Sequence, residues 1–278
     1  MSSVRGFAQV DVFTSEPTLG NPVAVVLDGA RLRNEQMQAF TDWTNLSEAT
    51  FVTPASNPTA DYAVRIFCPG RELPFAGHPT LGTCHAWLES GGQPKSEVIV
   101  QECGVGLVRI RRGTGSRLSF AAPPLRRSGP LTDSELDVLV HGLGLDKSQV
   151  ADHQWCDNGP GWQGILVDSV DTLRAIAPDG HLLAGLDVGV VAPSTDGADF
   201  EVRAFFPGNN GLTEDPVTGS LNAALAQWLI GSGRAPDTYT ASQGRSIGRD
   251  GRVFVERIDS DIWIGGESTT VITGSVLL

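Results

Sequence analysis

An internal repeat constrains the fold of this chain more than any other feature of its sequence. The segment Arg65-Ile-Phe-Cys-Pro-Gly70 is matched by Arg203-Ala-Phe-Phe-Pro-Gly208, and the following His78-Pro-Thr-Leu-Gly-Thr83 is matched by Asp215-Pro-Val-Thr-Gly-Ser220. Each copy then opens an apolar helix. Matched segments separated by about half of a chain are typical of two related domains. We therefore predict an α/β (α+β) protein with two pseudo-symmetric domains.

The boundary between these domains is expected in the segment APPLRRSGPLTD, where three prolines interrupt all hydrophobic periodicity. The predicted domains are residues 1–127 and 128–265. Strands are predicted over 49–53 and 62–67, and helices over 33–44, 79–88 and 221–230. The capping-box spacing of Thr132 and Glu135 predicts one more helix after the boundary.

Composition excludes several classes of function. The 278 residues carry 32 acidic against 20 basic side chains, a net charge of -12, which disfavours a nucleic-acid partner because phosphate binding needs a basic face. No secretory signal is visible, and no apolar run is long enough to cross a membrane. The four cysteines show neither zinc-site spacing nor disulfide density, so we expect a cytoplasmic protein without a metal.

Each copy of the repeat places a polar residue, a proline and then Gly-Thr or Gly-Ser at the start of a helix. The first backbone N–H groups of a helix have no intrahelical partner, so such a start stabilises a carboxylate without Lys or Arg. Two such ends would bind a small acidic substrate. Ordinary capping is the alternative: Asp215 is a favoured N-cap residue, and Thr83 and Ser220 could bond only their own turns.

Glu48 and His78 are the candidates for proton transfer. Glu48 lies in NLSEAT, where an apolar pocket would raise the pKa of its carboxyl group from about 4.3 toward a useful range. The spacing of Asn45 and Glu48 also fits a capping box, which would make Glu48 structural. His78 lies in the loop-like PFAGHPT and can act as acid or base, although a lone His more often satisfies local hydrogen bonds. No nucleotide-binding or nucleophile motif is present, so we expect no cofactor.

Four motifs, in order along nearly the whole chain, resemble the PhzF family of phenazine-biosynthesis proteins. They are VDVFTSEPTLGNPVAVVLD, NLSEATFV, PGRELPFAGHPTLGT and EDPVTGS. The resemblance implies a diaminopimelate-epimerase-like fold, in which each domain is a β-barrel-like sheet around a central helix and the active site lies in the cleft between the domains. It further implies a homodimer, and a return of residues 266–278 onto the first domain.

The resemblance also implies a reaction, the isomerisation of trans-2,3-dihydro-3-hydroxyanthranilate. In this sequence Glu48 would move the proton, His78 and Asp215 would complete the polar cluster, and Gly77, Gly219 and Ser220 would bind polar groups of the substrate. A family member that binds a ligand without catalysis is the alternative. A two-thiol amino-acid epimerase is disfavoured, because Glu48 and Asp215 occupy the segments expected to supply the two cysteines. Trp43, Trp155 and Trp162 are candidates for the substrate pocket.

Overall fold

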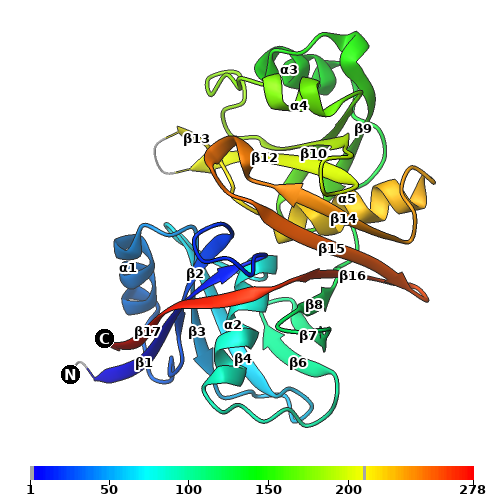
Figure 1. Cartoon of the computed structure of the whole chain (residues 1–278). Helices are drawn as coiled ribbons and strands as arrows, with labels where there is room; N and C mark the ends of the chain where they lie inside the picture. Colours follow the sequence, from blue (N-terminus) through cyan, green and yellow to red (C-terminus); the bar gives the residue numbers. More distant parts are fainter. Residues whose placement is uncertain (1–2, 209–210) are drawn as a thin grey trace. The chain divides into compact units, whose positions relative to one another are not determined.

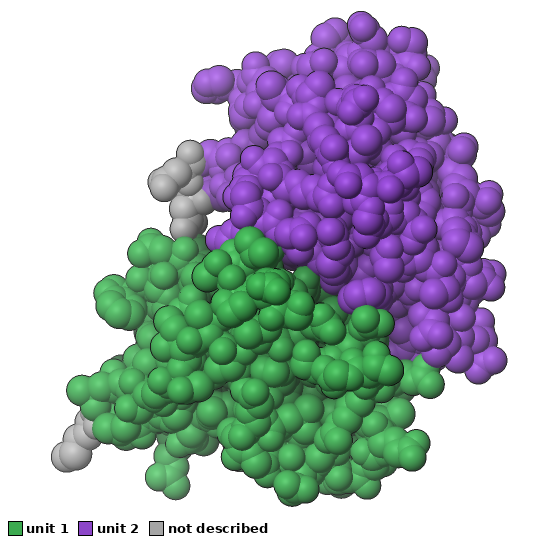
Figure 2. Space-filling view, viewed as in Figure 1, with its two compact units in different colours: residues 1–121, 265–278 green, residues 122–264 purple. Residues whose placement is uncertain are grey.

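The computed structural model of the chain describes residues 3–208 and 211–278, so the first two residues of the predicted domain 1–127 lie outside the described part. The chain divides into two compact units, shown in different colours in Figure 2. Unit 1 contains residues 1–121 and 265–278, and unit 2 contains residues 122–264. The fold is mixed α/β, as the repeat and the resemblance predicted.

Unit 1 is built from strands that surround one helix, α2 (Figure 1). Its strands are β1 (Val4–Val12), β2 (Asn21–Val26), β3 (Ala49–Thr53), β4 (Tyr62–Cys68), β5 (Arg71–Leu73), β6 (Ile99–Cys103), β7 (Gly106–Arg112), β8 (Leu118–Ala121) and β17 (Ser268–Leu277). Its helices are α1 (Asn34–Thr44) and α2 (Gly77–Glu89). Helix α2 contacts β1, β2, β3, β8 and β17, whereas α1 packs on β3 and β4. The last strand, β17, pairs antiparallel with β1 along the length of β1.

Unit 2 has the same kind of arrangement around helix α5. Its strands are β9 (Val150–Asp157), β10 (Gly161–Val167), β11 (Asp187–Pro193), β12 (Phe200–Gly208), β13 (Gly211–Glu214), β14 (Thr238–Gln243) and β15 (Gly251–Ile258). Strand β16 (Asp261–Gly266) spans the division between the units. The helices are α3 (Asp133–Leu143), α4 (Val170–Ala175) and α5 (Gly219–Gly231), with short 3-10 turns η1 (Lys147–Gln149) and η2 (Arg245–Ile247).

The two units share one order of strand pairing. In unit 1, β1 and β2 pair antiparallel, β2 and β3 parallel, β3 and β4 antiparallel, β4 and β6 parallel, and β6 and β7 antiparallel. The same alternation runs from β9 through β10, β11, β12 and β14 to β15 in unit 2. Identical pairing in both halves confirms that the sequence repeat reflects a repeated fold.

The register of the hairpins corrects the predicted alignment of the repeat. Phe67 pairs with Glu72 across β4 and β5, and Phe205 pairs with Glu214 across β12 and β13. Asp215 therefore corresponds to Leu73 in the other copy and not to His78. Because α2 and α5 begin at Gly77 and Gly219, His78 corresponds to Ser220. The similarity of HPTLGT and DPVTGS had shifted the predicted alignment by five residues.

The repeated Arg-x-Phe segment stabilises the same hairpin in both units. Arg65 stacks over Phe67 and bonds Glu72 on the neighbouring strand, and Arg203 stacks over Phe205 and bonds Glu214 in the same way. The two pairs differ in burial. The Arg203 and Glu214 side chains are only 7% and 11% exposed, against 29% and 41% for Arg65 and Glu72. The motif thus joins the two strands of the hairpin that precedes each central helix.

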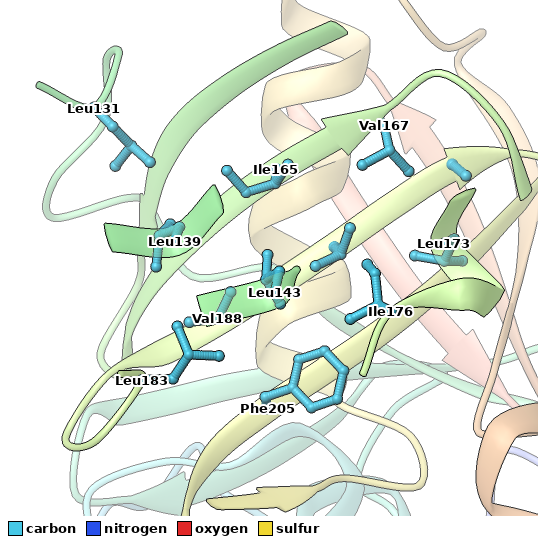
Figure 3. Close-up of a cluster of buried hydrophobic side chains, with 12 residues drawn as sticks. Leu131, Leu139, Leu143, Ile165, Val167, Leu173, Ile176, Leu183, Val188 and Phe205 are labelled. Atoms are coloured by element: carbon cyan, nitrogen blue, oxygen red, sulfur yellow. The ribbon is translucent and has the colours of Figure 1, made fainter. Parts of the chain in front are cut away.

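In unit 2 the sheet alternates between two packed faces, as the two-residue period of a strand requires. Val188 and Val190 face an apolar cluster formed with side chains of α3, α4, β10 and β12, shown in Figure 3. Gly189, between them, faces α5, where an added Cβ would lie 2.4 Å from Leu221. A glycine at this position lets the central helix approach the strand closely.

Two local predictions had opposite outcomes. Thr132 caps α3 in a capping box with Glu135, as predicted. The structural alternative for Glu48, a capping box with Asn45, is wrong: Asn45 ends α1 in the left-handed conformation, with φ 55°, and no helix starts there. None of the helices in the described ranges is long and apolar enough to be a membrane span.

Candidate active site

Glu48 lies in the short connection between α1 and β3. The left-handed Asn45 turns the chain at the end of α1, and the Glu48 carbonyl then accepts from the Ala24 N–H. The next residue, Ala49, begins β3 and is fully buried. Glu48 is thereby fixed at the rim of the apolar core, and its side chain is 16% exposed.

The structure brings Glu48 and His78 together. His78 is the second residue of α2, and its Nε2 lies 3.3 Å from Glu48 Oε2. The imidazole is almost fully buried, with 5% of its side chain exposed. Two residues far apart in sequence thus form a carboxylate and imidazole pair at the beginning of the central helix, and Gly77 lies next to this pair.

Burial sets the charge state of His78. Loss of hydration lowers the pKa of the imidazole to about 3, and the Pro22 carbonyl opposes this shift only in part. The Asn21 amide nitrogen lies 3.3 Å from His78 Nδ1, and Asn21 is fully buried. At neutral pH the residue beside Glu48 is therefore a neutral imidazole, which can accept or donate a hydrogen bond.

The depressed pKa of His78 makes a prediction about stability. Burial disfavours protonation of the His78 imidazole in the folded state. Its contribution to the free energy of unfolding is therefore present above pH 6.5 and is lost as the pH falls toward 3. Between pH 7 and pH 5 we expect the free energy of unfolding of the wild type to fall by up to about 2 kcal/mol more than that of His78→Gln. Denaturant unfolding of both proteins at each pH measures this difference. Parallel pH profiles would contradict the assignment.

The start of α2 is held by buried polar contacts. Gln101 donates to the Thr80 hydroxyl at 3.0 Å and accepts from the Tyr62 hydroxyl at 3.0 Å. The N-cap residue, Ala76, provides no side-chain hydrogen bond to the helix. The first N–H groups of α2, beginning at Gly77, therefore have no capping side chain, and such groups can bind an anion.

A second set of predicted residues lies in unit 2, around the start of α5. Asp215 is not the N-cap, which is Thr218, so the capping alternative for Asp215 is wrong. Instead Asp215 precedes the helix, and its Oδ2 accepts from the Thr218 hydroxyl at 2.6 Å. The helix then begins with Gly219 and Ser220. Glu48, His78 and Gly77 form one set in unit 1, and Asp215, Gly219 and Ser220 form another in unit 2.

The three tryptophan candidates differ in their surroundings. Trp43 is exposed on α1, and Trp155 stacks under the Arg127 guanidinium. Trp162 is buried and donates from its Nε1 to the Ser220 hydroxyl at 3.1 Å. The Asn158 amide donates to the Ser220 carbonyl at 2.8 Å. Trp162 is therefore the tryptophan that touches a predicted substrate-binding residue.

The thiols do not suit proton abstraction. All four cysteines are free, and burial raises the pKa of Cys84 and of Cys156 to about 12. Burial, together with the charge of Glu48, also raises the pKa of Cys68. Thiols with raised pKa values are poor bases at neutral pH. Within residues 3–208 and 211–278, no group of His, Cys, Asp and Glu side chains is arranged to hold a metal ion.

Sequence reasoning missed several residues of these two sets. Asn21 is 57 residues from His78, and Gln243, which contacts the Asp215 segment, is 25 residues from Thr218. Asn21 lies inside the motif TLGNPVAVV that supported the family resemblance, which was the available signal. Gln243, Thr218 and Asn158 are identified only by their three-dimensional contacts with Asp215 or Ser220.

Sequence comparison finds proteins that are similar along nearly the whole chain. The family of phenazine biosynthesis-like proteins, PhzC-PhzF, matches residues 10–274. Antisense-enhancing sequence 1 of Schizosaccharomyces pombe is 34% identical, covering 97% of this chain and 98% of that protein. Trans-2,3-dihydro-3-hydroxyanthranilate isomerase of Pseudomonas aeruginosa is also 34% identical, with 89% of this chain and 88% of that protein covered.

Solved structures show the same fold. A PhzF-family protein of Enterococcus faecalis covers 100% of both chains with a TM-score of 0.80 and 26% identity. The Bacillus anthracis PhzF-family protein covers 99% of this chain and 100% of that chain, with a TM-score of 0.84 at 23% identity. The chain belongs to the PhzF-like family of phenazine biosynthesis-like proteins, and is an isomerase of that family.

Proposed function

We propose that this protein is a cofactor-independent isomerase that moves a proton on a small, carboxylate-bearing, unsaturated substrate similar to trans-2,3-dihydro-3-hydroxyanthranilate. The observation that carries the proposal is the Glu48 and His78 pair, with a carboxylate oxygen 3.3 Å from a buried imidazole nitrogen. A partly buried carboxylate next to a neutral imidazole is suited to general acid–base catalysis. The name of the Pseudomonas aeruginosa relative supplies the substrate class.

In the proposed reaction, Glu48 removes a proton from one ring carbon and returns it to another. The neutral His78 imidazole lies 3.3 Å from the Glu48 carboxylate and orients it for proton transfer. Asp215 assists the conversion of the resulting enol to a ketone, in which the enol oxygen loses a proton and a ring carbon gains one. The N–H groups at the helix starts, at Gly77 and at Gly219, are suited to bind polar groups of the substrate, and the Ser220 hydroxyl is a further partner.

The proposal is tested by incubating the purified protein with trans-2,3-dihydro-3-hydroxyanthranilate and following its consumption by absorbance and chromatography. We expect catalytic conversion at a rate that scales with protein concentration. If the substrate binds and is recovered unchanged, the chain is a ligand-binding member of the family and the proposal is wrong.

We propose two further features: a homodimer, which the family resemblance implies, and a cytoplasmic location, which the cysteine pattern favours. Val271 and Ile272, on β17, are 41% and 48% exposed, and apolar side chains of this kind are available to a partner surface. Light scattering of the purified chain measures its mass in solution. A mass of one chain, 29.4 kDa, at micromolar concentration would exclude the dimer.

A further inference from the structure

Gln243, the last residue of β14, is fully buried against the segment that carries Asp215. Its Oε1 accepts from the Thr218 N–H at 3.0 Å and from the Asn222 amide at 2.9 Å. Its Nε2 donates to the Asp215 carbonyl at 3.1 Å and to the Thr218 hydroxyl at 2.9 Å. The Gln243 amide thus donates two hydrogen bonds and accepts two, and all four partners lie in the segment 215–222.

The direction of these bonds determines the orientation of the Thr218 hydroxyl. A Gln amide nitrogen can only donate, so the Thr218 oxygen is the acceptor in its bond with Gln243. The hydroxyl proton is then directed at Asp215 Oδ2, 2.6 Å away. Consecutive hydrogen bonds of this kind polarise and strengthen one another. Asp215 Oδ2 therefore accepts the hydroxyl proton of Thr218, and this bond orients the Asp215 carboxylate.

The backbone keeps Gln243 at this place. Gly244 follows it with φ 94°, a conformation that favours glycine, and an added Cβ there would lie 2.6 Å from the Pro216 carbonyl oxygen. In unit 1 the equivalent strand register puts Cys103 where unit 2 has Gln243, and Leu73 where unit 2 has Asp215. Unit 2, the copy of the repeat that has Asp215, is therefore also the copy that has a glutamine, Gln243, at this strand position.

We infer that Gln243 is a positioning residue, which acts through the Thr218 hydroxyl to orient the Asp215 carboxylate for proton exchange with the substrate. This inference rests on the proposed function of Asp215. Thr218 makes no side-chain hydrogen bond to the helix as its N-cap, so its hydroxyl serves Asp215 and Gln243 and not helix capping.

The test compares Thr218→Val, Thr218→Ser and Gln243→Glu in the full chain. The valine change removes the hydroxyl and keeps the shape, whereas the serine change keeps the hydroxyl. The glutamate change replaces the donating amide by a carboxylate, toward which the Thr218 hydroxyl would turn. We expect kcat to fall about ten- to a hundredfold in Thr218→Val and Gln243→Glu, since a hydrogen bond to a charged group is lost. KM should change less than about twofold, and Thr218→Ser should stay within about threefold of wild type.

The double variant Thr218→Val/Gln243→Glu separates positioning from general loss of structure. The effects of substitutions in one chain of hydrogen bonds are not additive. The kcat of the double variant should therefore be no lower than that of the less active single variant. Multiplied losses, or an unchanged kcat in Thr218→Val, would overturn the inference. The Thr218 pair keeps the test valid if Gln243→Glu does not fold.

A readout without substrate distinguishes this inference from the proposed function. The carbon-13 resonance of the Asp215 carboxyl group should shift in Thr218→Val and remain near its wild-type position in Thr218→Ser. If the wild type does not convert trans-2,3-dihydro-3-hydroxyanthranilate, the proposed function fails and this resonance still decides the orientation of Asp215. A resonance that is the same in all variants would overturn the positioning role.

Discussion

Replacing Glu48 by Gln is expected to lower kcat for the isomerisation by a factor of about 10² to 10⁴, the usual contribution of a general base. Glutamine preserves the shape of the side chain next to His78, whose Nε2 lies 3.3 Å from Glu48 Oε2, but it cannot take up a proton. Substrate affinity should change little, because Glu48 is assigned no role in holding the carboxylate. Steady-state kinetics and calorimetric titration with substrate measure the two effects separately.

The matched control is Glu97→Gln, which makes the same chemical change at an exposed position of unit 1. It should leave both kcat and KM at wild-type values. An active Glu48→Gln would show that another group moves the proton, and equal losses in both variants would indicate a general effect of charge on the protein.

The largest effect on stability is expected for Arg203→Met. Arg203 bonds Glu214 within a mostly buried pair and also donates to the carbonyls of Leu173 and Ile176 at the end of α4. Removing the guanidinium leaves a buried carboxylate and two carbonyls without this partner, which costs about 3–5 kcal/mol. Denaturant unfolding, with hydrogen exchange in α4 and β12 as the local measure, detects the loss in unit 2.

The repeat itself supplies the control for this prediction. Arg65→Met breaks the equivalent pair in unit 1, but that pair is more exposed, so the expected cost is below about 1 kcal/mol. Arg203→Met/Glu214→Leu should recover part of the loss, because no unpaired carboxylate remains buried. Equal costs for the Arg65 and Arg203 variants would contradict the assignment of their difference to burial.

The sequence predicted the elements whose signals are local. The capping box of Thr132 and Glu135, the strand predicted over 49–53 and the apolar helices after each copy of the repeat are all present in the structure. The same kind of signal was misleading at Asn45, because an Asn can either begin a helix or end one in the left-handed conformation. A local pattern therefore identified elements better than it identified their ends.

The candidate site was predictable only in part for the same reason. Glu48 and His78 could each be proposed from their segments, but their 3.3 Å contact depends on the packing of α2 against the strands of unit 1. Gln243 has no motif of its own, and its role depends on the parallel pairing of β14 with β12, which brings it beside the Asp215 segment. Contacts of this kind depend on tertiary structure and not on local sequence.

The central claim, that Glu48 moves a proton on the substrate, is tested most directly by isotope transfer. Trans-2,3-dihydro-3-hydroxyanthranilate is incubated in heavy water with wild type and with Glu48→Gln, and deuterium in recovered substrate and product is located by NMR and mass spectrometry. We predict that wild type forms a product labelled at a ring carbon and that the variant incorporates no label above the uncatalysed rate. Glu48-independent labelling, or binding without any exchange in wild type, would contradict the account.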